Sequence, residues 1–340
     1  MTRGGFGRRI AVAAFVALFS VCLAMTLAPR AGWAQQARQG VNPTAQAVKE
    51  EQLLKELDRV TGRVSIPDSK AGTLIQPEGR EWRAYHERTL HWIGGIAILG
   101  MLAVLALFYS VRGKIRIEHG WAGVKIMRFT TFERFVHWLT ASSFIVLALS
   151  GLNVVFGKVL LLPLVGSDAF AVFSQWAKYA HNYLSFAFAA GIVLTFVIWV
   201  TENIPNRTDI AWAKQGGGIL GHAHPPAGKF NGGQKLIFWS VVLVGAAIAA
   251  SGYVLMFPFY GTNIADMQVA QIIHGVLGVL MIAVILAHIY IGTLGMEGAF
   301  DAMGTGEVDL NWAKEHHSLW VEEEMSKARA AGGGAAVPAE

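Results

Sequence analysis

The sequence predicts an all-α membrane protein with five membrane-spanning helices. Of the 340 residues, 54% are apolar and only 15% are charged, and the mean hydropathy is positive. This composition excludes an ordinary soluble domain of the same length. Five apolar stretches reach about 20 residues each, the length that a helix needs to cross a bilayer. Because only helices and closed barrels satisfy every backbone hydrogen bond in lipid, we interpret all five stretches as helices.

The chain begins with the pattern of a secretory signal peptide. A basic start through Arg9 precedes an apolar stretch, Ile10–Leu27, and small residues stand just before Gln35. We expect residues 1–34 to be removed; the alternative is an uncleaved anchor helix, because the apolar stretch is long for a signal. The net charge of the chain is +5, and four of these charges lie in residues 1–34. The remainder is nearly neutral, so we expect no nucleic-acid partner.

The rest of the chain divides into an extension, five spans and a tail. Residues 35–90 are polar and contain turn-forming Pro and Gly, which predicts a mostly irregular segment outside the membrane. The apolar spans follow at His91–Val111, His137–Val155, His181–Val200, Leu236–Met256 and Val269–Leu294. We interpret residues 91–111 as an additional N-terminal transmembrane helix and residues 112–136 as a loop. Residues 137–294 then form a four-helix transmembrane bundle, and residues 295–340 form a tail.

The basic residues of the short loops predict the orientation, because cytoplasmic loops are enriched in Lys and Arg. The loop after the first span carries six basic residues and the loop after the third carries four. The loop after the second span has two, and the loop after the fourth has none. We therefore expect a multi-pass protein of the bacterial inner membrane, with residues 35–90 in the periplasm and the C-terminal tail in the cytoplasm. The signal peptide independently predicts the same orientation.

Two histidines in the last span are the most informative residues of the chain. His274 and His288 lie fourteen residues apart in a stretch without Asp, Glu, Lys or Arg. At about 100° and 1.5 Å per residue, both side chains leave one helix face, roughly 21 Å apart along the axis. An ionisable side chain inside the membrane is costly and is usually held by a partner. The spacing therefore predicts two buried ligand positions, one near each side of the membrane, as two stacked haems would require.

Two further histidines lie at matching depths. His137 opens the second span at its cytoplasmic end, and His181 opens the third span at its periplasmic end. We predict that His181 and His274 hold a periplasmic-side haem and that His137 and His288 hold a cytoplasmic-side haem, each iron receiving two neutral imidazoles. The alternative is that these histidines only form hydrogen bonds between helices. The single cysteine, Cys22, lies in the expected signal peptide, so any haem must be b-type, without covalent attachment.

The remaining histidines are interpreted as having no ligand role. His86 and His91 point in different directions from the start of a helix, and we expect interfacial or subunit contacts for them. Four others could bind a surface metal, although we favour solvated segments for all of them: His222, His224, His316 and His317. The chain also lacks the glycine patterns that bind nicotinamide, flavin or ATP. Another subunit must therefore supply any electrons.

Four segments resemble the gamma subunit of membrane-bound formate dehydrogenase, a dihaem b-type cytochrome. They are RFTTFERFVHWLTASSFIVLALSGL, KYAHNYLSFAFAAGIVLTFVIWVTENIP, KFNGGQKLIFWSVVLVGAAIAASGYV and IIHGVLGVLMIAVILAHIYIGTLGMEGAF. The similarity runs from about residue 127 to about residue 321, including WAKEHHSLW. It implies a four-helix core with two haems, a menaquinone site beside the cytoplasmic haem, and the ligands His137, His181, His274 and His288. The residues before this region are not part of the family's core pattern and receive no role from the resemblance.

The resemblance also implies that Asn231 and Gly233 of FNGGQK contact the quinone, near His288. The residue types suit this role. An asparagine provides both a donor and an acceptor for a quinone carbonyl, and glycines allow backbone N–H groups to approach the ring closely. The alternative for this segment is a flexible loop that enters a helix.

These observations predict an electron-transfer subunit without a substrate-oxidising site of its own. The resemblance implies a periplasmic catalytic dehydrogenase subunit that oxidises formate and an iron–sulfur subunit that passes its electrons to this chain, which delivers them to quinone on the cytoplasmic side. One alternative is a cytochrome b anchor for a nickel–iron hydrogenase or another periplasmic dehydrogenase. Another is a transporter or a non-redox structural anchor. The FNGGQK and AKEHH segments favour the formate branch.

Overall fold

The structure, a computed structural model, describes residues 79–219, 221, 223–258 and 260–330. Five helices in this part of the chain are long and apolar enough to cross a membrane: Glu81–Arg112, Thr131–Leu160, Ser167–Trp199, Gly232–Met256 and Ile264–Gly295. The prediction of an all-α membrane protein with five spans is confirmed. The expected signal peptide, residues 1–34, and residues 35–78 of the expected extension lie outside the described residues.

The helices extend beyond the apolar runs that predicted them, chiefly at their N-terminal ends. The first helix runs without interruption through α5 (Gly79–Ala84), the π-helical η1 (Tyr85–Thr89) and α6 (Leu90–Arg112). Helix α9 (Ser167–Trp199) begins well ahead of His181, so this histidine lies inside the helix and does not open it as predicted. The reason is that polar residues in the first turns of α9 end the apolar run but remain compatible with helix at the membrane surface.

Helix α7 (Thr131–Leu160) packs against α9 along much of its length. Its start is fixed by a capping box, in which the Thr130 side chain accepts from the Glu133 backbone and the Glu133 side chain accepts from the Thr130 backbone. Such caps contribute about 1 kcal/mol. The short α8 (Leu162–Val165) turns the chain from α7 into α9. A Cβ atom at Gly191 would lie 3.1 Å from the Thr140 Cα atom, so the two backbones approach closely.

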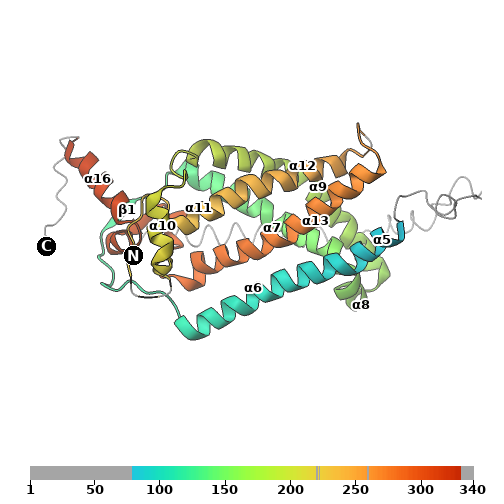
Figure 1. Cartoon of the computed structure of the whole chain (residues 1–340), viewed down its shortest axis with the longest axis horizontal. Coiled ribbons are helices and arrows are strands. Elements are labelled where there is room, and N and C mark those ends of the chain that lie inside the picture. Colours follow the sequence, from blue (N-terminus) through green and yellow to red (C-terminus); the bar gives the residue numbers. More distant parts are fainter. Residues whose placement is uncertain (1–78, 220, 222, 259, 331–340) are drawn as a thin grey trace, which may run out of the picture. The chain divides into compact units, whose positions relative to one another are not determined.

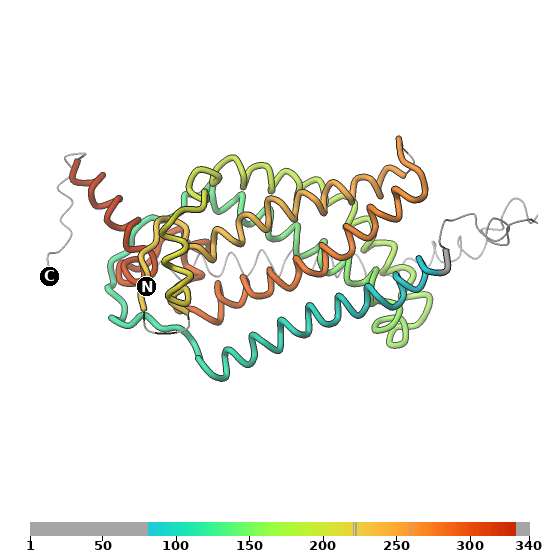
Figure 2. Tube along the Cα trace, in the orientation of Figure 1, coloured from blue at the N-terminus to red at the C-terminus, as the bar shows by residue number. Residues whose placement is uncertain are grey.

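The last two spans form a second packed pair. Helix α11 (Gly232–Trp239), the π-helical η3 (Ser240–Val244) and α12 (Gly245–Met256) make one continuous span. Helix α13 (Ile264–Tyr290) continues into the π-helical η4 (Ile291–Gly295). Helix α13 packs against α12 on one side and α6 on the other, as Figures 1 and 2 show. It therefore lies between the first helix and the remaining spans.

The connections after the first and third spans and the C-terminal tail fold together at the end of the bundle where α7 begins and α13 ends (Figure 1). We call the described residues within 113–130, 200–231 and 296–330 the loop–tail unit. Its strands β1 (Lys125–Met127) and β2 (Glu307–Asp309) pair antiparallel, with Ile126 opposite Val308. Its helices are α10 (Arg207–Lys214), the 3₁₀ turn η2 (Gly216–Gly218), α14 (Asp301–Gly304), α15 (Leu310–His316) and α16 (Ser318–Ala330).

A shared apolar core joins the loop–tail unit to the bundle. Val308, Trp312 and Trp320 of the unit are almost fully buried, and they belong to one cluster with Trp199 and Phe238 from the spans. By contrast, large apolar side chains cover the outer faces of the spanning helices, with Leu99 and Leu107 of α6 each about two-thirds exposed. An apolar outer surface of this kind is what lipid requires, so the polar contacts concentrate inside and at this end.

Candidate functional site

The structure brings the four predicted histidines together as two pairs. The ring centroids of His181 and His274 lie 5.9 Å apart, and their planes are inclined by 69°. The ring centroids of His137 and His288 lie 6.3 Å apart, with an angle of 60°. These are the pairs that depth along the spans predicted.

The distances suit a metal held between two imidazoles. A metal–imidazole bond is about 2 Å long, so two rings on opposite sides of one metal have centroids about 6 Å apart. Two imidazoles joined by a direct hydrogen bond would not need space for a metal between their nitrogen atoms. Among the described residues, no group of three or more His, Cys, Asp or Glu side chains could hold a metal ion. The donor set of each pair is therefore two imidazoles, as in a bis-histidine haem site.

The secondary structure explains why the pairs form. Helix α13 contributes His274 and His288, which its periodicity places on one face about 21 Å apart. Helix α9 contributes His181, and α7 contributes His137 in its second turn. Because α7 begins at the end where α13 finishes, His137 meets His288 there. The pairs thus occupy opposite ends of α13.

The hydrogen bonds of His181 assign its tautomer. The Ser150 hydroxyl lies 2.7 Å from the Val146 carbonyl oxygen and 3.0 Å from the Leu147 carbonyl oxygen. Carbonyls only accept, so the hydroxyl proton is committed to them. His181 Nδ1 lies 2.8 Å from the same hydroxyl oxygen. Nδ1 therefore carries a proton and donates it to Ser150, which leaves Nε2 with the lone pair that a metal needs.

The hydrogen bonds of His274 give the same result. Its Nδ1 atom lies 2.9 Å from the Ile248 carbonyl oxygen, which can only accept. Nδ1 also lies 3.4 Å from the Ser251 hydroxyl oxygen. A Cβ atom at Gly252 would lie 3.0 Å from the His274 Cε1 atom, so a larger residue would press on the ring. His274 thus also presents Nε2 as its free nitrogen.

The pair at the other end of α13 has different surroundings. His137 Nδ1 is buried, and no hydrogen bond to it is found within the described part of the chain.

Two glycines lie near the His181/His274 pair. Gly278 lies one turn after His274 on the same helix face, and a Cβ atom there would meet nothing within 4 Å. A Cβ atom at Gly151, in contrast, would lie 3.6 Å from the His181 Cε1 atom. The residues of both pairs fit b-type haem, and Gly278 provides a cradle that a side chain would narrow.

The FNGGQK segment forms the start of α11. The Asn231 side chain accepts from the Gln234 backbone at 3.0 Å, in a capping box that Gln234 completes. Cβ atoms at Gly232 and Gly233 would each lie 2.9 Å from the Trp212 ring, so both positions require glycine for packing. These contacts show that the segment is a defined helix start. The quinone contacts predicted for Asn231 and Gly233 remain a prediction.

The interpretation of His316 and His317 as residues of a solvated tail was wrong. His317 is 1% exposed, and its Nδ1 atom donates to the Gly228 carbonyl oxygen at 2.8 Å. His316 lies beside Trp312, with ring centroids 5.2 Å apart. The tail carries enough apolar residues to fold on the loop after the third span, which the apolar-run analysis did not detect. His222 lies outside the described residues.

The other histidines make local contacts. His224 lies at the surface, 3.0 Å from a Glu118 carboxylate oxygen. His119, which suggested no role in the sequence, contacts the buried Glu315 at 2.8 Å. His91 Nδ1 lies 3.1 Å from the His86 carbonyl oxygen. The first helix therefore holds these two histidines by a local bond.

Burial shifts the pKa values of several groups in the loop–tail unit. It lowers the pKa of Arg128 to about 9, so the guanidinium is charged at neutral pH. Burial also lowers the pKa of His316 to about 4, and it lowers the pKa of His317 well below the ordinary value, with the nearby Arg128 charge adding to the effect. Both histidines are consequently neutral in the folded protein at pH 7.

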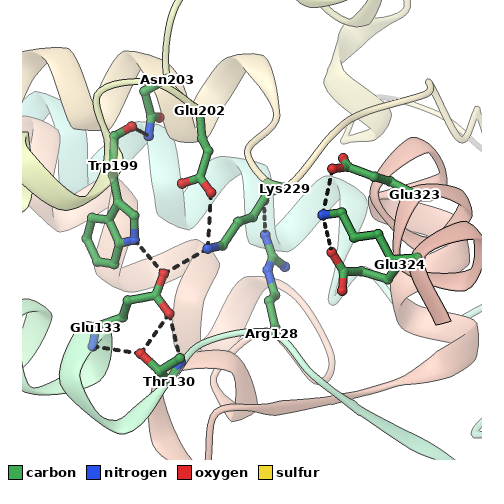
Figure 3. Close-up of polar contacts among 10 residues, drawn as sticks. Arg128, Thr130, Glu133, Trp199, Glu202, Asn203, Lys229, Glu323 and Glu324 are labelled. Carbon is green, nitrogen blue, oxygen red and sulfur yellow. Dashed lines mark hydrogen bonds and ion pairs between the residues drawn. The ribbon is translucent and has the colours of Figure 1, made fainter. Parts of the chain in front are cut away.

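A polar network at the start of α7 was not predicted (Figure 3). Glu133 Oε1 accepts from Lys229 Nζ at 2.8 Å and from Trp199 Nε1 at 2.9 Å. Arg128 donates to the Lys229 carbonyl oxygen at 2.6 Å. The network ties three segments together one helical turn before His137. The Thr-x-x-Glu pattern at residues 130–133 could have signalled the capping part of it, but the distant partners have no local sequence signal.

Comparison with known proteins gives consistent matches. A family model described as prokaryotic cytochrome b561 matches residues 128–306. The formate dehydrogenase cytochrome b556(fdo) subunit of Escherichia coli (strain K12) is 32% identical over 202 residues, 58% of this chain and 92% of that protein. The nitrate-inducible formate dehydrogenase cytochrome b556(Fdn) subunit of the same strain is 31% identical over 211 residues, 60% of this chain and 94% of the relative. The formate dehydrogenase cytochrome b556 subunit of Haemophilus influenzae (strain ATCC 51907 / DSM 11121 / KW20 / Rd) is 29% identical over 208 residues, 59% and 84% of the respective chains.

The region matched by the family model covers the last four spanning helices. The family model begins at residue 128, just before α7, and ends at residue 306, just before β2. It contains the four spans that carry the histidine pairs. The first helix, α5 to α6, lies outside it.

Proposed function

Because this chain belongs to the prokaryotic cytochrome b561 family, we propose that it is the membrane-anchoring, dihaem cytochrome b subunit of a formate dehydrogenase complex. In this role it connects a periplasmic dehydrogenase with quinone on the cytoplasmic side of the membrane. The observation that carries the proposal is the presence of two imidazole pairs, with centroid separations of 5.9 and 6.3 Å, at opposite ends of α13. The names of the relatives support formate as the substrate of the partner.

Each pair has a defined task in this proposal. His181 and His274 hold a b-type haem on the periplasmic side, and His137 and His288 hold a second one on the cytoplasmic side. A b-type haem with two axial imidazoles supplies one-electron transfer without making or breaking a bond to substrate. The histidines act as ligands and not as acid–base groups. The apolar bundle around them excludes water and sets the distance between the two sites.

The direction of electron flow follows from the orientation of the chain. The loops with most Lys and Arg belong to the loop–tail unit, next to His137 and His288. Basic loops favour the cytoplasm, so the His181/His274 pair faces the periplasm. An iron–sulfur subunit and a formate-oxidising subunit dock on that side. Quinone reduction on the opposite side takes protons from the cytoplasm and makes the overall reaction charge-separating.

Asn231, Gly233 and His288 are the proposed quinone contacts. Support comes from the position of α11, which packs against α13. The Asn231 side-chain oxygen is engaged in the helix cap, while its amide N–H₂ group has no acceptor among the described residues and is suited to donate to a quinone carbonyl. The role of Gly233 would be to expose its backbone N–H group.

The substitution Asn231→Asp tests the quinone site, because aspartate caps a helix as well as asparagine but has no amide donor. In the purified complex, formate-dependent quinone reduction should fall at least tenfold while haem content stays unchanged. Asn263→Asp is the matched control, since Asn263 makes the same capping box at the start of α13. Unchanged quinone reduction in Asn231→Asp would remove this residue from the site.

The partner is tested by affinity purification of the tagged chain from its membranes. Co-purification of formate-oxidising activity supports the proposal. Co-purification of hydrogen-oxidising activity instead would identify an anchor of a hydrogenase. A purified chain without haem would identify a structural anchor.

A further inference from the structure

A Ser-Gly pair occurs at corresponding places beside His181 and His274. Ser150 and Gly151 lie on α7, the spanning helix before the one that carries His181. Ser251 and Gly252 lie on α12, the helix before the one that carries His274. In each case the serine hydroxyl contacts Nδ1 of the histidine, and the glycine faces the imidazole ring. This repeated arrangement is found at one of the two histidine pairs.

Both serine hydroxyls can only accept a hydrogen bond from the neighbouring imidazole, because their own protons are used elsewhere. The Ser251 hydroxyl lies 2.8 Å from the Ala247 carbonyl oxygen and 3.0 Å from the Ile248 carbonyl oxygen, which commits its proton to its own helix. Ser150 makes the same two bonds to Val146 and Leu147. A hydroxyl whose proton is used in this way presents only lone pairs to the neighbouring imidazole. The arrangement therefore sets the direction of each hydrogen bond, from the imidazole to the serine, which two polar residues at a helix interface would not do by themselves.

We propose that Ser150 and Ser251 are positioning residues that fix His181 and His274 in the Nδ1-protonated form and make them stronger electron donors to the iron. An imidazole that donates its second N–H to a fixed acceptor is a more basic ligand. A more basic ligand favours the oxidised iron, so it lowers the reduction potential of the site. This inference rests on the proposed function, because it concerns the haem of the His181/His274 pair.

The other pair provides the contrast. His137 Nδ1 is buried without a hydrogen-bond partner in the described part of the chain, and no Ser-Gly pair faces it. This hydrogen bonding therefore lowers the potential of the His181/His274 site relative to a site whose ligand lacks such an acceptor, as His137 does. A lower potential at this site favours electron transfer toward His137 and His288, which is the direction that quinone reduction needs.

The two serines differ in the strength of their contacts, which sharpens the test. Ser150 Oγ lies 2.8 Å from His181 Nδ1, whereas Ser251 Oγ lies 3.4 Å from His274 Nδ1. A backbone carbonyl lies near each Nδ1 atom, that of Leu147 for His181 and that of Ile248 for His274, so the difference between the two sites rests on the hydroxyl distance. Ser150→Ala should therefore have a larger effect than Ser251→Ala.

The experiment is a redox titration of the purified full chain with its haems, followed by visible and EPR spectra. Ser150→Ala should shift the midpoint potential of the His181/His274 haem upward and alter its low-spin EPR signal, while the other haem stays unchanged. Ser150→Thr, which keeps the hydroxyl, should restore the wild-type values. Ser143→Ala is the matched control, because Ser143 is a buried α7 serine that donates to the Leu139 carbonyl oxygen at 2.7 Å.

Each outcome has a separate meaning. If Ser150→Ala leaves both potentials unchanged, or if Ser143→Ala shifts them equally, the positioning role is refuted while the dihaem proposal stands. If the wild-type chain binds no haem, the proposed function itself fails. If Ser150→Ala does not retain the haem, Ser150→Cys gives the same comparison, because its sulfur is a weak acceptor, and an unchanged potential in that variant would overturn the inference.

Discussion

Lys235 is a buried cation whose role is structural. Its Nζ atom lies 2.9 Å from Asp209 Oδ2 and donates to the Ile204 carbonyl oxygen at 3.1 Å. The Lys235 side chain is 7% exposed and the Asp209 side chain 18%. The pair joins α11 to α10 directly beside the capped start of α11. It therefore fixes the segment that holds the proposed quinone contacts.

Replacement of Lys235 by alanine should destabilise the protein by about 3 kcal/mol, because it leaves Asp209 as a largely buried, unpaired charge. The measurement is the thermal unfolding midpoint of the purified chain in detergent. Lys214→Ala provides the control, since Lys214 is exposed. Equal midpoints for Lys235→Ala and the wild type would show that the ion pair contributes nothing.

At the scale of residues, the sequence identified the four paired histidines because their spacing and depth have few alternatives in an apolar span. It did not identify Ser150 or Ser251, since serines in membrane helices usually bond only to their own backbone. It also misplaced His316 and His317 in solvent. The buried His317 bonds to the Gly228 carbonyl oxygen, which is distant in the sequence and leaves no periodic signal.

Two buried histidines at the end of α15, His316 and His317, couple the stability of the loop–tail unit to pH. In the unfolded chain His316 and the adjacent His317 have the ordinary pKa of 6.5, whereas burial lowers the pKa of His316 to about 4 and that of His317 well below 6.5. Below pH 6.5 the unfolded chain consequently binds more protons than the folded one. The stability of the loop–tail unit is complete above pH 6.5 and declines as the pH falls toward 4.

We predict a decline of about 1.4 kcal/mol per pH unit for each of these histidines. Hydrogen exchange of α15 and α16, corrected for the intrinsic pH dependence, should become faster between pH 6.5 and 4.5. His317→Asn keeps a donor for the Gly228 carbonyl but does not titrate, so its profile should be flatter. His86→Asn, in the first helix and outside the loop–tail unit, should resemble the wild type. A wild-type profile without this decline would contradict the account.

At the scale of elements, five apolar runs predicted five spanning helices, and this was confirmed. Helix ends were predicted less well, because polar first turns such as those of α9 continue the helix beyond the hydrophobic run. The strands β1 and β2 were missed altogether. Each has three residues, and their pairing joins segments about 180 residues apart. No local sequence pattern therefore predicts this pairing.

The loops at one end of the molecule carry most of the Lys and Arg residues, and the loops at the other end carry few. Helix α16 belongs to the loop–tail unit at one end of the bundle, whereas the connection between α12 and α13 lies at the opposite end. Tyr260 in that connection is 90% exposed. These two regions should therefore face opposite sides of the membrane.

Cysteine labelling tests this orientation in a Cys22→Ser background, which has no other thiol. A membrane-impermeant maleimide should label Tyr260→Cys in intact spheroplasts and should label Ser326→Cys only after lysis. Ser326 is exposed on α16. The reverse labelling pattern would invert the proposed orientation and place the quinone site on the periplasmic side.

At the scale of the whole molecule, composition and the five apolar stretches predicted a multi-pass membrane protein, which was confirmed. The orientation predicted from the basic-loop counts stays a prediction. The folding of residues 113–130, 200–231 and 296–330 into one unit was not predicted. Its core combines residues from every one of these segments, such as Phe129, Phe230 and Trp312. Such long-range contacts are decided by tertiary packing and not by local periodicity.

The central claim is that two pairs of histidines each hold a b-type haem. The most direct measurement is the haem content of the purified chain, by pyridine haemochrome and a reduced-minus-oxidised spectrum, for the wild type, His181→Ala and His288→Ala. His224→Asn serves as the control with a surface histidine removed. The account predicts two haems per chain in the wild type and control, and one in each of the other variants. A wild type without haem, or variants that retain both haems, would contradict it.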